Sequence, residues 1–260
     1  MDPVQAVVLA LVQGFTEFLP ISSSGHLILM PAFFGWTDQG LGFDIAVHLG
    51  TLIAVVAYFR RDIVAMSGAM LRREGAEARL AWQIIAATVP LGIAGLVFAD
   101  LVETTLRAPI VIAASSAGFG ALLWAADFWR RGPGSERELG WSHALAIGFA
   151  QALALIPGTS RSGITMTMAL ALGMSREAAG RFSFLLAIPA IGMAGAWQAL
   201  QFARAPDPVD WTVLAVAAGI SAVTAFVAIA VFLRLIGKIG MAAFAIYRIV
   251  LAGVILYVLV

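Results

Sequence analysis

The sequence of 260 residues is 61% hydrophobic and 12% charged, and its formal net charge is +1. An average soluble domain is about 45–50% apolar and about 25% charged, so this composition excludes an ordinary soluble protein and predicts an integral membrane protein. The chain has no cysteine, which excludes disulfides, thiolate chemistry and cysteine-based metal sites. Because the sequence has no basic run, we expect no nucleic-acid partner.

The first apolar segment, at residues 3–35, is broken in its middle. Pro20 removes a backbone donor, the serines at 22–24 compete for backbone hydrogen bonds, and Gly25 permits a turn. A single straight helix does not fit this pattern. The segment instead predicts a helix–turn–helix hairpin that enters and leaves the membrane on the same side.

Three uninterrupted apolar segments follow, at roughly 43–59, 81–101 and 109–129. A second broken segment then covers 143–175, where Pro157 and Gly158 interrupt the pattern. Three more apolar segments complete the chain, at roughly 182–202, 212–233 and 241–259. Each uninterrupted segment approaches the ~20 residues that a spanning helix needs. The sequence therefore predicts an all-α integral membrane protein with six transmembrane helices and two re-entrant hairpins, in a single transmembrane domain over residues 1–260.

The two broken segments are similar to each other. QGFTEFLPISSSGH begins at Gln13 and QALALIPGTSRSGI begins at Gln151, and Gly25 aligns with Gly163 at the same offset. Since three spans follow each hairpin, the second copy is inverted relative to the first. We expect an inverted-topology repeat, at about 1–130 and 143–260, whose discontinuous helices meet near the middle of the membrane.

Basic residues are distributed unevenly between the loops. Twelve of the 16 lysines and arginines lie near residues 60–80, 130–142, 176–181 and 234–240, whereas the alternate loops carry Arg107 and Arg204. The positive-inside rule therefore predicts that the first set of loops is cytoplasmic. The first hairpin then enters from the outside, and the second enters from the cytoplasm.

Glu17 is the first candidate for chemistry, because a carboxylate deep in the bilayer costs about 2.5–3.5 kcal/mol and normally faces a protein or water-filled interior. Gln13 lies one helical turn earlier on the same face. The two side chains either join helices as a structural polar pair or provide a general base or metal ligand. The residues that follow favour the second interpretation.

A serine run and Gly25 then begin a new helix, and His26 lies one turn into it. Hydroxyls and turn amides at a helix start form an anion-binding concavity that the helix dipole supports. His26 can transfer protons near neutral pH. Serine caps are common at helix starts, so the prediction of a site here depends on the nearby Glu17.

Arg161, within PGTSRSG, indicates the substrate. A guanidinium at the tip of a buried hairpin needs an anion, and its geometry suits phosphate oxygens. Thr159, Ser160 and Ser162 add donors beside it. Arg161 could instead pair with Glu17 as a structural salt bridge. If both hairpin tips converge, the combined groups best serve phosphoryl transfer.

Two other polar groups have open roles. His48 lies four residues after Asp44, and it either lines the pocket or, as we favour, is a satisfied interior histidine. Arg248, unusually deep in the last span, either neutralises an acidic partner or reaches phosphate. Small residues such as Gly192 and Gly219 are expected at helix-packing positions.

The two polar motifs together resemble the signatures of a known family. QGFTEFLPISSSGHL is similar to the first signature of the undecaprenyl-pyrophosphate phosphatase family, also linked to bacitracin resistance, and PGTSRSG is similar to its second. The similarity extends along the whole chain. It implies a bacterial plasma-membrane enzyme, open to the outer (periplasmic) face, that hydrolyses a long-chain prenyl pyrophosphate to the monophosphate and inorganic phosphate. Such an enzyme recycles the lipid carrier for cell-wall synthesis.

The resemblance also assigns residues. The family's essential glutamate, its Glu-or-Gln position, its active-site hydroxyls, its histidine and its arginine correspond to Glu17, Gln13, Ser22 and Ser23, His26 and Arg161. We expect four further substrate contacts, from Ser24, Thr159, Ser160 and Ser162. The resemblance implies a divalent cation, Mg²⁺ or Ca²⁺. Because Gln13 is not acidic, the cation would depend on Glu17, substrate oxygens and water.

Ser23 is the nucleophile that we favour, with Glu17 or His26 accepting its proton, while attack by water or by His26 itself stays open. Expected partners are the prenyl pyrophosphate and membrane lipid, and the oligomeric state is open, a homodimer included. Two rival classes remain. A transporter or flippase of a phosphorylated lipid would share the repeat architecture, and an intramembrane serine protease would leave Arg161 without a role.

Overall fold

The computed structural model describes residues 2–129, 134–204 and 209–260. Within these ranges the secondary structure is helical, with no β-strand, so the all-α prediction is confirmed. Arg130 and Arg131, which the sequence places in a basic loop, lie outside the described residues, as does the end of the first predicted repeat at 130.

Six of the described helices are long and apolar enough to cross a membrane, as predicted. They are α3 (Gly40–Tyr58), α5 (Gly75–Val97), α7 (Pro109–Trp129), α10 (Arg176–Arg204), α11 (Trp211–Ile239) and α12 (Ala242–Leu259). Several extend beyond the apolar segments that predict them. The first turns of α5 and α10 carry Glu77 and Glu177, and the last turn of α11 carries Lys238. These polar turns continue the helices past the apolar core.

The two broken segments form shorter helices, with breaks where the sequence predicts them. The first gives α1 (Pro3–Thr16) and α2 (Ser23–Phe34). The second gives α8 (Trp141–Ala152), a 3-10 turn η2 (Leu153–Leu155) and α9 (Arg161–Ala171). Three short elements were not predicted: α4 (Arg60–Arg72), α6 (Ala99–Thr104) and η1 (Glu136–Glu138). Helices of 11 to 14 residues, the lengths of α1, α2, α8 and α9, are too short to span a bilayer.

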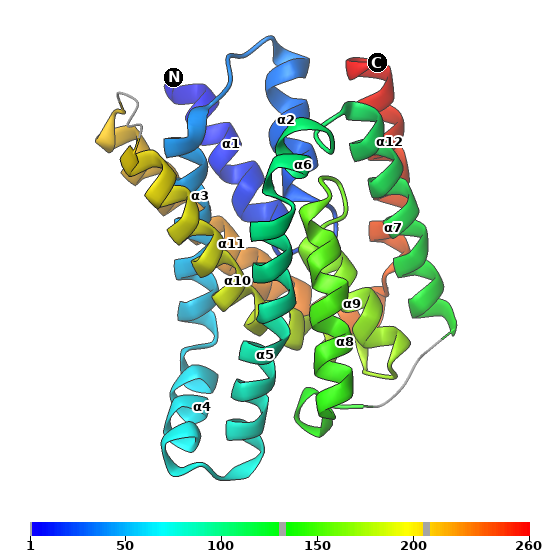
Figure 1. Ribbon diagram of the computed structural model, residues 1–260. Helices are drawn as coiled ribbons and strands as arrows, with labels where there is room; N and C mark the ends of the chain where they lie inside the picture. Colours follow the sequence, from blue (N-terminus) through cyan, green and yellow to red (C-terminus); the bar gives the residue numbers. More distant parts are fainter. Residues whose placement is uncertain (1, 130–133, 205–208) are drawn as a thin grey trace.

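The two pairs of short helices come from opposite ends of the molecule. Both chain termini and the start of α1 lie at one end, whereas α4 and the start of α8 lie at the other (Figure 1). The turns between the paired helices lie in the interior. This arrangement is the one that two opposed re-entrant hairpins require; the re-entrant path and the inverted repeat themselves stay predictions.

The end that carries α4 is called the basic end. Here Arg181 of α10 forms ion pairs with Asp62 of α4, at 2.6 Å, and with Glu136 of η1, at 2.8 Å. Arg176, also on α10, binds the carboxylate of Asp127 on α7 through two nitrogens. The basic segments near 60–80 and 176–181, which the sequence assigns to one side of the membrane, therefore do lie at one end of the fold.

Close helix packing depends on glycines other than those expected. A methyl group built on Gly14 of α1 would lie 2.6 Å from the carbonyl oxygen of Ser221, and one on Gly148 of α8 would lie 2.5 Å from that of Ala87. By contrast, a methyl group on Gly192 or Gly219 would meet open space among the described residues. The expectation that Gly192 and Gly219 pack helices together is wrong.

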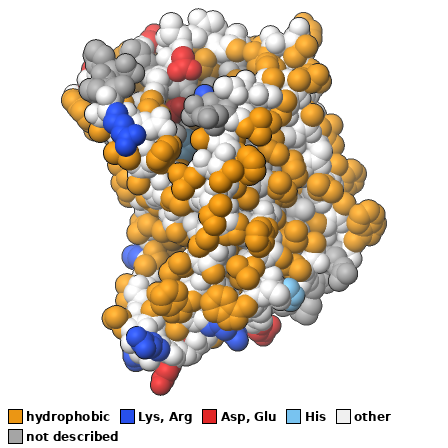
Figure 2. Space-filling view, viewed as in Figure 1, with side chains coloured by type: hydrophobic (Ala, Val, Ile, Leu, Met, Phe, Trp, Pro, Cys, Tyr) orange, Lys and Arg blue, Asp and Glu red, His pale blue; other side chains and the backbone are white. Residues whose placement is uncertain are grey.

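The surface matches the demands of a bilayer. Hydrophobic side chains cover the broad middle of the face in Figure 2, and most of the charged side chains visible there lie near the two ends. Large apolar residues such as Val223, Leu96 and Ile93 are more than half exposed on the spanning helices. In water such a surface would associate, whereas lipid tails solvate it.

Candidate active site

The first hairpin tip, residues 17–22, is shaped by a strained serine cap. Ser22 precedes α2 with φ of 71°, a left-handed conformation that non-glycine residues rarely adopt. Its hydroxyl accepts the backbone N–H of Gly25 at 3.4 Å and lies 3.2 Å from the hydroxyl of Ser24. The cap therefore turns the chain into α2 and satisfies the N–H of Gly25.

The second hairpin tip repeats this construction. Ser160 precedes α9 with φ of 66° and accepts the N–H of Gly163 at 3.2 Å, and its hydroxyl lies 3.2 Å from that of Ser162. The same strained cap, the same acceptor and the same serine pair thus occur at aligned positions of the two broken segments. This likeness of backbone geometry supports the predicted repeat.

The two tips contact each other directly. The hydroxyl of Ser162 donates to the carbonyl oxygen of Leu19 at 3.0 Å. Nη2 of Arg161 lies 3.4 Å from Oε1 of Glu17, and Nη1 donates to the carbonyl oxygen of Ser183 on α10 at 3.2 Å. Arg161 Nε is buried and has no partner among the described residues. The expected convergence of the tips is present, and Arg161 keeps a donor free.

Glu17 accepts hydrogen bonds from side chains of its own hairpin. Its Oε2 accepts the hydroxyl of Ser23 at 2.8 Å and the side-chain amide of Gln13 at 3.1 Å. The Glu17 side chain is 8% exposed, so these donors and Arg161 stabilise a nearly buried carboxylate. Ser23 is therefore already hydrogen-bonded to the group that could take its proton.

A cavity of about 240 Å³ lies between the tips. Its polar lining comes from Glu17, Ser23, Ser24, His48, Ser160, Arg161 and Gln198, and apolar residues of α5, η2 and α10 complete it. Leu91 on α5 and Gln198 on α10 lie in the halves of those helices that are farther from the basic end. The cavity is therefore displaced toward the end that carries the chain termini.

The predicted site residues fall into two groups. Five of them line the cavity: Glu17, Ser23, Ser24, Ser160 and Arg161. The other five lie behind it. Gln13 supports Glu17, Ser22 and Ser162 shape the tips, and Thr159 is fully buried with its hydroxyl unpartnered among the described residues. His26 is the fifth.

The histidine that lines the cavity is not the one that the sequence favours. His26 Nδ1 donates to the carbonyl oxygen of Ser22 at 2.7 Å, and its Nε2 lies 2.6 Å from the hydroxyl of Tyr247 on α12. Both ring nitrogens are thus engaged away from the cavity. His48, favoured as an interior histidine, instead lines the cavity, with Nε2 3.9 Å from Oε2 of Glu17. The catalytic role of His26 stays a prediction.

Within the part of the chain that the structure describes, Arg248 lacks the acidic partner that was one of the two alternatives for it, and the alternative of a phosphate contact stays a prediction. The side chain is fully buried in α12, and Nη2 donates to the carbonyl oxygens of Gly158 and Thr159 at 2.9 and 2.7 Å. Nε donates to the carbonyl oxygen of Ser116 on α7 at 3.1 Å. No hydrogen bond or ion pair joins it to a carboxylate among the described residues. Arg248 therefore satisfies the turn carbonyls that the break in the second hairpin exposes.

The donor set fits a divalent cation held through few protein ligands. No group of three or more His, Cys, Asp or Glu side chains that could hold a metal occurs among the described residues. The cavity nevertheless presents the Glu17 carboxylate beside the hydroxyls of Ser23 and Ser24, which are hard oxygen donors. These oxygen donors are of the kind that Mg²⁺ and Ca²⁺ prefer.

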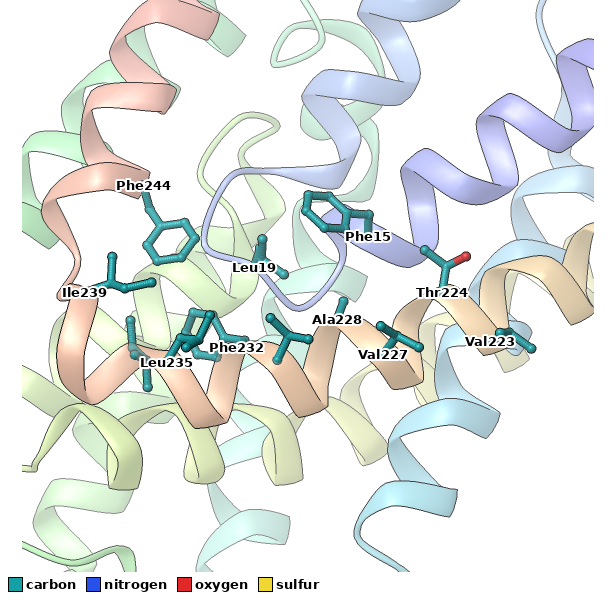
Figure 3. Close-up of a pocket in the computed structure, with 12 residues that line it drawn as sticks. Phe15, Leu19, Val223, Thr224, Val227, Ala228, Phe232, Leu235, Ile239 and Phe244 are labelled. Atoms are coloured by element: carbon teal, nitrogen blue, oxygen red, sulfur yellow. The ribbon is translucent and has the colours of Figure 1, made fainter.

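An apolar groove of about 370 Å³ lies on the other side of the first tip (Figure 3). Phe15 and Leu19, two residues before and two residues after Glu17, contribute to it, together with α11 residues such as Val227 and with Phe244 of α12. Thr224 is the one polar residue in its described lining. Because the groove is almost entirely apolar, it suits a hydrocarbon chain rather than a phosphate.

Comparison with known proteins shows the family of the chain. The model of the family described as bacitracin resistance protein BacA matches residues 6–254. "Undecaprenyl-diphosphatase 2" of Stutzerimonas stutzeri (strain A1501) is 51% identical over 98% of both chains. "Undecaprenyl-diphosphatase" proteins of Nitrosococcus oceani and Teredinibacter turnerae are 49% and 51% identical, over 99% and 100% of both chains. The chain therefore belongs to the bacitracin resistance protein BacA family of integral membrane proteins.

Proposed function

We propose that this protein is a prenyl-diphosphate phosphatase. It hydrolyses undecaprenyl diphosphate to undecaprenyl phosphate and inorganic phosphate in the bacterial inner membrane. One observation carries the proposal: the carboxylate of Glu17, the hydroxyl of Ser23 and the guanidinium of Arg161 share one small cavity at the meeting point of two broken helices. The names of the full-length relatives support the same reaction and the same lipid.

Substrate binding follows from the cavity lining. Arg161 and the first amides of α2 and α9 would hold the diphosphate oxygens, because both helix starts carry a partial positive charge. The unpartnered Nε of Arg161 offers a further donor. A divalent cation anchored through Glu17 would supply additional neutralisation of phosphate charge. The apolar groove beside Phe15 and Leu19 is our candidate for the part of the prenyl chain next to the diphosphate.

In the mechanism that we propose, Ser23 attacks the terminal phosphorus. Its hydroxyl already donates to Glu17 Oε2, so the carboxylate accepts the proton as the new Oγ–P bond forms. The bond from phosphorus to the bridging oxygen breaks, and the prenyl monophosphate leaves. Water then attacks the phosphoserine, which releases inorganic phosphate and restores Ser23. Direct attack by water would leave no phosphoenzyme, whereas attack by His26 would leave a phosphohistidine.

The cavity position supports a periplasmic site. The basic loops predict that the basic end faces the cytoplasm, and the cavity is displaced toward the opposite end. The diphosphate would therefore be bound and hydrolysed at the outer side of the inner membrane.

Phosphate release by the purified protein in detergent tests the proposal. We expect inorganic phosphate to form from a prenyl diphosphate, and a chelator to abolish its formation. A lipid transporter needs a sealed vesicle to show activity, so an active protein in detergent separates the two classes. A pure, folded preparation that releases no phosphate at any divalent-cation concentration would contradict the proposed function.

A further inference from the structure

His48 is held in a defined orientation by its own helix. Nδ1 lies 2.7 Å from the carbonyl oxygen of Asp44, one turn earlier in α3. A carbonyl oxygen only accepts, so Nδ1 carries the proton and donates it. In the neutral ring Nε2 then carries the lone pair. The helix backbone thus fixes both the tautomer and the direction of the ring.

The lone pair of His48 faces a carboxylate across the cavity. Nε2 lies 3.9 Å from Oε2 of Glu17, which is too long for a hydrogen bond. Oε2 already accepts hydrogen bonds from Ser23 and Gln13, and Oε1 lies beside Arg161. Two electron-pair donors therefore line one cavity, 3.9 Å apart, and Glu17 has its negative charge compensated without the histidine.

This arrangement is the one that metal-binding histidines use. Their second ring N–H is typically donated to a backbone carbonyl or carboxylate, which fixes the ring and leaves the other nitrogen for the ion. Two donors of one ion are normally about 3.0–3.4 Å apart, so a small rotation of the Glu17 side chain would bring Oε2 and Nε2 to that separation. Both groups line the same cavity, where water and phosphate oxygens can complete the coordination shell.

We propose that His48 Nε2 and the carboxylate of Glu17 together bind one divalent cation of the first transition series at the diphosphate site. An imidazole ligand favours such ions over Ca²⁺ and Mg²⁺, which prefer oxygen. The cation preference of this chain therefore extends to Mn²⁺ and similar ions. The inference rests on the proposed function, since the diphosphate would supply the remaining ligands.

Mn²⁺ binding to the full-length protein tests the inference without relying on activity. The protein is purified in detergent with an affinity tag that lacks histidine, and it is stripped of metal. The electron paramagnetic resonance signal of free Mn²⁺ gives its affinity, with and without methylene diphosphonate, a non-hydrolysable stand-in for the substrate headgroup. Electron spin-echo modulation then reports whether an imidazole nitrogen binds the ion. The chain has three histidines, so H48Q, H26Q and H143Q remove them one at a time.

We expect imidazole coupling in the wild type, in H26Q and in H143Q, and its loss in H48Q. H48Q should also weaken Mn²⁺ binding by roughly ten-fold or more, while competition by Ca²⁺ changes less than about three-fold. Wild-type protein labelled with ¹⁵N-histidine needs no substitution, and its modulation frequencies should shift. The inference is overturned if wild-type protein binds no Mn²⁺ with the diphosphonate present, if bound Mn²⁺ shows no imidazole coupling, or if the coupling survives in H48Q.

Phosphate release from farnesyl diphosphate, measured on the same preparation, separates the two claims. Hydrolysis without imidazole coupling would remove the role of His48 and leave the proposed function intact. Imidazole coupling without hydrolysis would retain the cation site and contradict the phosphatase activity.

Discussion

Glu17 and Arg161 lie 144 residues apart in the chain, and their side chains are 3.4 Å apart between Oε1 and Nη2. The contact joins the tips of two hairpins that come from opposite ends of the molecule. A structural salt bridge alone would explain the pair. We propose that the pair is part of a site, because the cavity, the free Arg161 Nε and the Ser23 hydroxyl lie beside it.

Replacing Arg161 with lysine should lower phosphate release by on the order of 100-fold, the usual cost of losing one charge-stabilising donor. Lysine keeps the positive charge but lacks the planar fork that can contact Glu17, Ser183 and phosphate together. Steady-state phosphate release measures the loss. R204K, at the exposed end of α10, is the matched control and should keep its activity. A near-normal rate in R161K would remove Arg161 from the site.

Ser23→Ala should lower phosphate release by about a thousand-fold or more, as expected for a lost nucleophile. S24A removes a neighbouring cavity hydroxyl that has no hydrogen bond to Glu17, and we expect a loss of less than about ten-fold. Acid quenching with a ³²P-labelled substrate should trap the label on Ser23. A label on His26, or none under conditions that capture phosphoenzymes, would contradict the serine mechanism.

Gly158→Ala should destabilise the second tip and reduce activity. Gly158 has φ of 90°, where alanine costs about 1–2 kcal/mol, and a methyl group would also collide with the Ile112 carbonyl oxygen and the Ser115 hydroxyl. Gly173 provides the control, because its φ is 91° and a methyl group there meets open space. Thermal unfolding in detergent should show a larger loss for G158A. Equal losses would show that backbone strain alone decides the effect.

Val227→Trp should fill part of the apolar groove and select against long substrates. Val227 lines the groove and is 55% exposed, so the larger side chain can be accommodated without disturbing buried residues. V216W, on an exposed position of the same helix outside the groove lining, is the control. We expect kcat/KM to fall several-fold for a long prenyl diphosphate and to change little for a very short one. Equal effects on both substrates would show that the groove does not receive the chain.

The orientation can be measured by chemical labelling, because the natural chain has no cysteine. Asp38→Cys lies just before α3 at the end that carries the termini, and Arg72→Cys lies at the end of α4, at the basic end. A membrane-impermeant maleimide applied to intact spheroplasts should label D38C, whereas R72C should require permeabilisation. The reverse pattern would place the cavity on the cytoplasmic side.

The long helices could be predicted because a helix that crosses the hydrocarbon core of a bilayer needs about 20 mostly apolar residues. The ends of these helices could not be predicted in the same way. The first turn of α5 and the last turn of α11 are polar and continue the helix beyond the apolar core. The amphipathic α4 has no comparable apolar signal, so packing against α5 decides its conformation. Composition therefore predicts which segments enter the membrane better than where each helix stops.

The tips were identifiable because strong polar groups interrupt apolar sequence, and such groups need partners. The sequence could not predict which histidine reaches the cavity, because this depends on how α3 and α2 are rotated about their axes when they pack. His26 turns toward Tyr247, and His48 turns toward Glu17. The partner of Arg248 was also missed, because unpaired backbone carbonyls leave no trace in the sequence.

The two tips share the same serine cap but carry different charged side chains. The first carries Glu17 where the second carries Leu155, and the second carries Arg161 where the first carries Ser23. A second, symmetry-related centre facing the opposite leaflet would therefore lack both the carboxylate and the guanidinium. If the proposed function holds, turnover is confined to lipids presented from one side, and we expect a carrier molecule in the other leaflet to cross the bilayer before this protein acts on it.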